Sequence, residues 1–120
     1  MTDNSKVLVD KIIEGIQGKK GHDIVIADVS HIDGMICQAF VMCTGTSPSQ
    51  IEAIAESIGD KGRIDLHDKP THVVGLGQAV WVAMDYTDVM VHIFLPEARD
   101  LYDLEHLWED AVLEEIEDLD

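Results

Sequence analysis

Aromatic residues, cysteines and basic residues are all scarce in this chain, and long hydrophobic runs are absent. Of its 120 residues, 5% are aromatic, two are cysteines, and eight are lysine or arginine against 24 aspartates and glutamates. The formal net charge of −16 argues against direct binding to nucleic acid or to anionic membranes. No apolar stretch approaches the roughly 18 residues of a membrane span. Since no basic leader precedes an apolar run either, we expect a soluble, cytoplasmic protein.

Cysteine and histidine spacing does not predict a disulfide, a metal site or a catalytic nucleophile. Cys37 and Cys43 lie six positions apart in a segment with strand character, which would separate them by about 20 Å at roughly 3.3 Å per residue. Neither a Cys-x-x-Cys nor a His-x-x-x-His pattern occurs. His92 stands between Val91 and Ile93, and we interpret it as a hydrogen-bonded core histidine. The sequence therefore gives no positive evidence for a cofactor or for catalysis.

Acidic residues concentrate at the C-terminal end of the chain. Residues 97–120 hold eleven acidic residues and one basic residue, Arg99. We interpret the residues past Ala111 as a solvated acidic tail that favours solubility. A chain of this length suits one domain with a single core, so residues 1–111 are expected to form that domain and residues 112–120 the tail.

Three segments have the hydrophobic spacing of helices. The clearest begins at Ser47, where Gln50 completes a capping box, Pro48 takes the first helical position and Gly59 ends the apolar periodicity. A polar loop is expected to follow at residues 60–70. The other two helices are expected at residues 4–16, capped by Asn4 or Ser5, and at residues 96–108.

Short β-branched segments predict five strands. They are expected at residues 23–29, 37–43, 71–77, 80–85 and 88–94. The first two are expected to pair, and the last two to be joined by the tight Asp-Tyr-Thr-Asp connection. Because the last two strands do not alternate cleanly between apolar and polar residues, both faces of that part of the sheet should be covered. The expected fold class is α/β, close to α+β, with a mixed five-stranded sheet flanked by helices.

Two aspartates interrupt the apolar run WVAMDYTDVMVHIF of residues 81–94. Asp85 and Asp88 could hold a hard cation, as in a metal-dependent nucleotidyltransferase. Their spacing is Asp-x-x-Asp across a turn, however, and carboxylates at the ends of a hairpin connection are more often turn formers that bond to backbone amides. The enzyme is therefore the alternative hypothesis, and we expect these aspartates to shape the turn and present charge to a partner.

Most of the few aromatic residues lie near the acidic end of the chain. Phe94 is expected in the core, whereas Tyr102 and Trp108 are interleaved with aspartates and glutamates. Aromatic anchors with carboxylates at their rim suit a basic protein partner. The pattern therefore predicts a protein-binding surface.

The run WVAMDYTDVMVHIFLPEARDLYDLEHLW, residues 81–108, resembles the ribosomal silencing factor family (RsfS, also called Iojap). That family has Trp-Val, Asp-Tyr-Gly-Asp-Val-x-Val-His and Glu-x-Arg-x-x-Tyr-x-Leu-Glu-x-Leu-Trp at this spacing. FVMCTGTSPSQIEAIAESI, residues 40–58, is similar to the family's earlier strand, Gly-x-Ser and helix. Two departures are Gln38-Ala39 in place of the usual Asp-Tyr, and Thr87 in place of the usual glycine of the turn.

The resemblance implies a nucleotidyltransferase-like topology without enzymatic activity. It also implies a repressor that binds the large ribosomal subunit through large-subunit protein fourteen, blocks association with the small subunit, and lowers translation in starvation or stationary phase. A homodimer of the free protein through the same surface would compete with the ribosome. The partner-binding residues implied by matching are Trp81, Asp85, Tyr86, Asp88, Glu97, Arg99, Tyr102, Leu104 and Glu105, with Leu107 and Trp108 supporting them.

Overall fold

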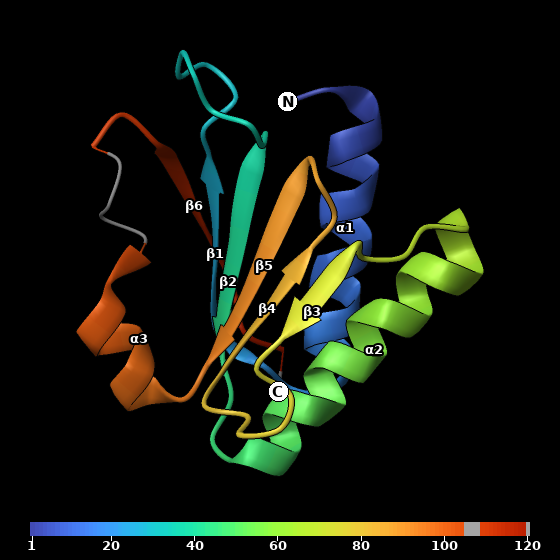
Figure 1. The fold of residues 1–120 in the computed structure, drawn as a ribbon, viewed down its shortest axis with the longest axis vertical. Coiled ribbons are helices and arrows are strands. Elements are labelled where there is room, and N and C mark those ends of the chain that lie inside the picture. The colour runs from blue at the N-terminus through green and yellow to red at the C-terminus, as the bar shows by residue number, and fades with distance from the viewer. Residues whose placement is uncertain (105–108, 120) are drawn as a thin grey trace.

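A computed structural model describes residues 1–104 and 109–119, and in this part of the chain three α-helices pack on one mixed sheet of six strands (Figure 1). Helices α1 and α2 cover one face of the sheet, and α3 lies on the other (Figure 1). In chain order the elements are α1 (Asp3–Gly18), β1 (His22–Asp28), β2 (Ala39–Thr44), α2 (Pro48–Leu66), β3 (His72–Val74), β4 (Trp81–Asp85), β5 (Val89–Phe94), α3 (Pro96–Tyr102) and β6 (Val112–Ile116).

The strand order across the sheet is β3-β4-β5-β2-β1-β6. The central pair, β2 and β5, is parallel, with Ala39 opposite Val89, and every other pair is antiparallel. The expected α/β class with a mixed, helix-flanked sheet is confirmed. The pairing of the first two strands and of the β4–β5 hairpin is confirmed as well. The nucleotidyltransferase-like topology stays a prediction.

The expectation of five strands is wrong, because the sheet has a sixth, β6, in the segment that we interpreted as an acidic tail. β6 pairs antiparallel with β1, and Ile116 stands opposite Ile24. Backbone pairing at a sheet edge tolerates acidic side chains as long as these stay in water, and Glu114 and Glu115 are exposed. The high acidic charge of this segment therefore did not exclude it from the sheet.

Apolar side chains fill both faces of the sheet, as expected. Between the sheet and the two long helices lie Ile12 and Ile16 of α1 and Ile54 and Ile58 of α2. On the other face, Phe40, Met42 and Phe94 pack against Ala98 of α3 and against the segment that connects β1 to β2.

The two cysteines are free, and they lie on opposite faces of the sheet. Cys43 lies in β2 and faces α1 and α2, whereas Cys37 precedes the strand and packs on the opposite face. Strand geometry, assumed for both residues, applies only to Cys43.

α1 and α2 approach each other closely at Gly15. A Cβ atom built on Gly15 would lie 2.9 Å from the Cα of Ile58, closer than real Cβ atoms come to another heavy atom. The Ser57 hydroxyl also donates a hydrogen bond of 2.8 Å to the Gly15 carbonyl. The glycine that interrupts the apolar face of α1 therefore sets the distance between the two helices.

Helix ends differ from the expectations at three places. The N-cap of α1 is Thr2, not Asn4 or Ser5. The start of α2, by contrast, agrees with the prediction, since Ser47 caps the helix and accepts the Gln50 N–H at 3.1 Å. α2 continues past Gly59 to Leu66, so the expected loop at residues 60–70 is mostly helix. α3 ends at Tyr102, and part of the helix expected up to residue 108 lies outside the described residues.

Replacement of Gly59 by alanine is expected to stabilise the protein by about 1 kcal/mol, because glycine is the poorest ordinary helix former and alanine the best. No heavy atom lies within 4 Å of a Cβ built at this position, so the added methyl group costs no packing. Urea unfolding of Gly59→Ala beside the wild type measures the gain. Gly62→Ala is the control from the same helix, since its Cβ would lie 3.1 Å from the Asp68 carbonyl. A stability of Gly59→Ala below that of the wild type would contradict the placement of Gly59 inside α2.

Among the described residues, no helix is long and apolar enough to cross a membrane.

Candidate functional site

The β4–β5 hairpin distributes the expected partner-binding residues over both faces of the sheet. Side chains alternate along a strand, so Trp81 and Asp85 share one face of β4. Val82 and Met84 point to the other face, toward α1 and α2. Tyr86 follows β4 directly and packs on that helix face as well. Trp81 and Tyr86 therefore lie on opposite sides of the sheet.

The face opposite α1 and α2 carries a cluster of rings, which we call the aromatic cluster (Phe40, Trp81, His92, Phe94 and Tyr102). Its centre is Trp81, whose ring centroid lies 4.5 Å from that of Tyr102, 5.2 Å from that of Phe94 and 5.7 Å from that of His92. His92 lies 5.9 Å from both Phe40 and Phe94. Such pairs add to the stabilisation by area burial. The cluster joins the last residue of α3 to the sheet.

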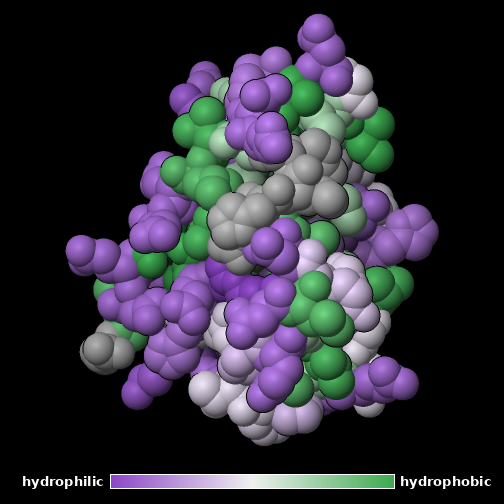
Figure 2. Space-filling view, turned by 90° about the vertical axis from the view of Figure 1, so that its left-hand side faces the viewer, coloured by the Kyte–Doolittle hydropathy of each residue, from purple (hydrophilic) through white to green (hydrophobic). Residues whose placement is uncertain are grey.

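The outer part of this cluster is exposed and surrounded by acidic side chains. Tyr102 is 50% exposed and its neighbour Leu101 is 77% exposed, while Glu97, Asp100 and Asp103 are exposed on or next to α3. Figure 2 views the side of the molecule on which α3 and β6 lie and shows apolar patches among hydrophilic ones. We call the partly buried ring of Trp81 and the half-exposed ring of Tyr102, with Leu101 and Glu97, the aromatic face.

His92 is a buried, neutral hydrogen-bond acceptor inside the aromatic cluster. The indole N–H of Trp81 donates to Nδ1 of His92 over 3.0 Å, which places the imidazole proton on Nε2. Burial lowers the pKa of His92 from 6.5 to about 4. The interpretation of His92 as a hydrogen-bonded core histidine is thereby confirmed, and the bond fixes the orientation of the Trp81 ring.

The stability of the protein is expected to fall as the pH falls from 6.5 toward 4. In this range the unfolded chain binds a proton at His92 while the folded chain does not, so acid favours the unfolded state by about 1.4 kcal/mol per pH unit, or about 2 kcal/mol at pH 5. Urea unfolding at pH 7.5 and pH 5 measures the loss. His92→Gln has no titrating group at this position and is the control. An equal loss in both proteins would assign the effect to the carboxylates instead.

The turn between β4 and β5 is shaped by the side chain of Asp85, whereas the side chain of Asp88 faces solvent. The Asp85 carboxylate accepts the Thr87 N–H at 2.7 Å, and this confirms its expected role as a turn former. The Asp88 carbonyl accepts the Gln38 N–H at 2.6 Å, while its side chain is exposed. Thr87 adopts a φ of 74°, a conformation that glycine reaches without strain. In residues 1–104 and 109–119, no group of three or more His, Cys, Asp or Glu side chains could hold a metal ion.

Tyr86 supports this turn from the helix side. Its side chain is 6% exposed and lies against Gly62 of α2. Within the described residues its hydroxyl has no hydrogen-bond partner. Burial, followed by the charge of Asp68, raises the pKa of Tyr86 to about 12. A substitution of Tyr86 would therefore disturb the fold before it changed any exposed contact.

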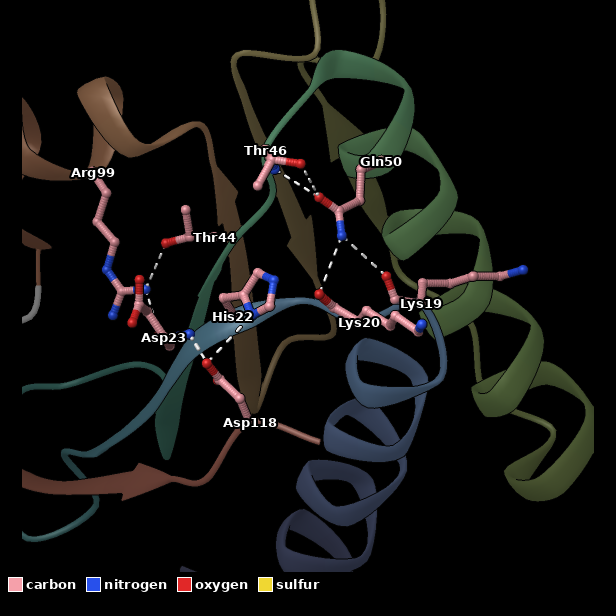
Figure 3. A network of polar contacts seen from close by, with 9 residues as sticks. All are labelled: Lys19, Lys20, His22, Asp23, Thr44, Thr46, Gln50, Arg99 and Asp118. Carbon is pink, nitrogen blue, oxygen red and sulfur yellow. Dashed lines mark hydrogen bonds and ion pairs between the residues drawn. The ribbon is translucent and has the colours of Figure 1, made fainter. Parts of the chain in front are cut away.

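Arg99 anchors α3 from within the protein. Its side chain is 8% exposed, and its Nη1 donates to the Asp23 carbonyl and, over 2.9 Å, to the Thr44 hydroxyl (Figure 3). The guanidinium thus connects α3 to β1 and β2. Arg99 does not present its charge to solvent, so any role in partner binding is to position the exposed residues of α3.

A bulge in β1 turns the Asp23 backbone toward both Arg99 and the chain after β6. The register of β1 shifts between His22 and Val25, and Asp23 has a φ of 52°. The Asp23 N–H donates to Asp118 over 3.1 Å, and Nδ1 of His22 lies 3.2 Å from the other oxygen of the same carboxylate (Figure 3). Asp118 therefore binds the backbone N–H of Asp23, while Arg99 binds its backbone carbonyl.

The remaining expected residues fall in three groups. Glu97 and Asp88 are exposed, and Leu104 is partly buried against the face that holds the aromatic cluster. Glu105, Leu107 and Trp108 lie outside the described residues. Sequence reasoning missed Asp23, Thr44 and Asp118, for which the one available signal was Arg99 itself, the single base of an acidic segment.

The fold and the site together define a small α/β domain with an exposed, acid-flanked aromatic face. A family model described as "Ribosomal silencing factor during starvation" matches residues 2–120. The chain belongs to this ribosomal silencing factor (RsfS) family, as the sequence resemblance predicted.

Similar proteins agree over most of the chain. The Ribosomal silencing factor RsfS of Bacillus subtilis is 32% identical over 95% of this chain and 95% of its own length. The protein of the same name from Chromobacterium violaceum is 35% identical over 80% of this chain and 77% of its own length. A crystal structure of a protein from C. violaceum, 34% identical, superimposes with a TM-score of 0.81 over 87% of this chain and 85% of that chain.

Proposed function

We propose that this chain represses translation by binding the large ribosomal subunit through large-subunit protein fourteen and by sterically blocking association with the small subunit. The mechanism requires occupation of a surface and no chemical step. Such a factor would act when nutrients are scarce, in starvation or stationary phase. Membership of the ribosomal silencing factor family supports the ribosomal role, and the aromatic face supports the mode of binding.

The observation that carries the proposal is the half-exposed Tyr102 ring, which packs at a tilt against Trp81 beside exposed carboxylates. Tyrosine and tryptophan are enriched among the residues that dominate binding energies. Carboxylates at the rim pair with lysine and arginine of a basic partner and accelerate association. Because the chain carries a net charge of −16, a basic ribosomal protein is a better partner than ribosomal RNA.

The expected residues have different roles in this proposal. Tyr102, Trp81, Glu97 and Asp88 would contact the partner. Asp85, Tyr86 and Arg99 would position those contacts from within the turn and beneath α3. Leu104 would support Tyr102. Glu105, Leu107 and Trp108 lie outside the described residues, and their part in partner binding is proposed from the family resemblance alone. A homodimer of the free protein through the aromatic face would use the same residues and compete with the ribosome.

Loss of the Tyr102 ring is expected to weaken binding to the large subunit at least about tenfold, as for an interface anchor. Co-sedimentation with separated subunits measures it, for wild type, Tyr102→Ala and Glu97→Lys, with Asp10→Lys on the far side of the sheet as the control for charge. Wild type and control should pellet with the large subunit alone, and the two variants should stay in the supernatant. Equal pelleting of all four proteins would show that the partner does not bind at the aromatic face.

The alternative function is a metal-dependent nucleotidyltransferase that uses Asp85 and Asp88. Its support is the clustering of two carboxylates at one turn, although the Asp85 carboxylate already accepts the Thr87 N–H. Calorimetry with magnesium or manganese and nucleoside triphosphates distinguishes the two functions. Binding heat that is lost in Asp88→Asn would favour the enzyme.

A further inference from the structure

The two edges of the sheet differ in how they meet solvent. β6 forms one edge and carries exposed Glu114 and Glu115. Charged side chains on an edge strand discourage pairing with another chain. β3 forms the other edge and is uncharged apart from the titratable His72, and its Val73 and Val74 are 37% and 60% exposed. Within the described residues, the β3 edge therefore lacks the acidic side chains that β6 carries, although its length of three residues limits pairing with another chain.

A groove lies between β3 and α2, which run side by side at this end of the sheet (Figure 1). Its volume is about 570 Å³. Ala55 and Met84, which are nearly buried, form its floor, and the exposed Val73 and Leu76 form its wall on the sheet side. The groove opens on the helix face of the sheet, whereas the aromatic face lies on the opposite side.

The helix side of this groove is acidic. Glu52 and Glu56 line it, are exposed, and stand one helical turn apart on α2. Among the described residues neither is in an ion pair with a basic side chain. The groove thus combines an apolar floor with an anionic rim. This combination suits lysine or arginine, whose aliphatic stem can lie on apolar surface while the charged head stays at the rim.

We propose that the groove between α2 and β3 is a docking site for an extended basic segment of a partner protein, with arginine or lysine at alternate positions. Side chains two residues apart in an extended segment lie about 7 Å apart on one face, close to the roughly 6 Å that separates Glu52 from Glu56 along the helix. Their stems would cover Val73, Leu76 and Met84, and the segment's backbone would pair with the free edge of β3.

Charge argues for a basic partner and against a second copy of this chain. Each copy carries a net charge of −16, and pairing of two β3 edges would bring the glutamates of both α2 helices together. Like charges at an interface oppose association. Because the groove and the aromatic face lie on opposite sides of the sheet, this site can be occupied while the other is bound, and it does not depend on the ribosomal function.

An NMR titration of the isotope-labelled full chain tests the proposal. The probe is the capped peptide Arg-Thr-Arg-Thr-Arg-Thr, and the control peptide has citrulline in place of each arginine, which keeps the stem and removes the charge. The arginine peptide is expected to shift the amides of residues 52–60 and 72–76 with a dissociation constant of about 1 mM or below. The citrulline peptide should bind at least about tenfold more weakly.

The double variant Glu52→Lys with Glu56→Lys is expected to lose at least about tenfold in affinity for the arginine peptide. Asp10→Lys with Glu14→Lys is the matched control, since these exposed residues have the same spacing on α1 and undergo the same change of charge. Its affinity should stay within about twofold of the wild type. Three results would overturn the proposal: shifts centred on β6, equal binding of both peptides, or no shift at millimolar peptide. Shifts at residues 72–76 that depend on protein concentration alone would assign the groove to a second copy instead.

Discussion

Arg99→Met is expected to lose about 3 kcal/mol of folding free energy. The substitution keeps most of the side-chain volume but removes the donor that serves the Asp23 carbonyl and the Thr44 hydroxyl. Buried groups that lose a charged hydrogen-bond partner cost about 1–3 kcal/mol each. The Thr44 hydroxyl belongs to a residue that is 4% exposed, and the Arg99 side chain is 8% exposed, so water replaces the lost donor poorly at Thr44. The Asp23 carbonyl is only partly buried and contributes less to the loss.

Urea unfolding at pH 7.5 measures the loss in Arg99→Met, and Arg99→Lys is the conservative control. Lysine keeps a charge and one donor direction but not the fork of the guanidinium, so an intermediate stability is expected. Binding to the large subunit should weaken in Arg99→Met even at temperatures where the variant is folded. The reason is that α3, which carries Tyr102, then loses its anchor to the sheet. A variant as stable as the wild type would show that the buried arginine does not hold α3.

Gly15→Val is expected to lose about 3 kcal/mol, and Gly15→Ala less. The first added carbon atom would already lie 2.9 Å from the backbone of Ile58, which cannot rotate away as a side chain can. The two helices must therefore move apart, and the bond from the Ser57 hydroxyl to the Gly15 carbonyl lengthens with them. Loss of close packing between α1 and α2 exposes the largest apolar layer of the protein.

Thermal and urea unfolding of Gly15→Val, Gly15→Ala and Gly18→Ala measure this effect. Gly18 is the matched control, since it lies in the same helix and a Cβ there would meet only the Ser57 hydroxyl at 3.8 Å, an ordinary contact. Gly18→Ala is expected to be neutral or slightly stabilising. If Gly15→Ala were as stable as Gly18→Ala, the close approach of the helices at Gly15 would be wrong.

Local signals in the sequence predicted local structure well. The capping box at Ser47 and Gln50 placed the start of α2 correctly, because the cap is a contact between residues three apart. The end of α2 was misplaced at Gly59, because a glycine costs a helix only about 1 kcal/mol, which packing of the following turn against the sheet can outweigh. The sequence prediction missed β6 because this strand depends on pairing with β1, which lies about ninety positions earlier in the chain.

The sequence predicted which residues belong to the candidate site better than it predicted where their side chains lie. Alternation along β4 separates Trp81 from Tyr86, yet the motif that contains both gives no sign that they face opposite sides. The buried position of Arg99 depends on a bulge at Asp23 and on Thr44, both distant in the sequence. Such networks cannot be read from spacing, because their members meet only after the sheet has formed.

The parallel pairing of β2 with β5 has a consequence for how the chain reaches this fold. Ala39 meets Val89, fifty positions later, so the centre of the sheet closes only after α2, β3 and β4 are available. Contacts of such long sequence separation slow folding. During synthesis, α1 and the β1–β2 hairpin emerge first. One edge of the apolar strand β2 then stays unpaired until β5 has been made. The newly made chain should therefore be most prone to aggregation, and most dependent on chaperones, in the interval before residue 94 leaves the ribosome.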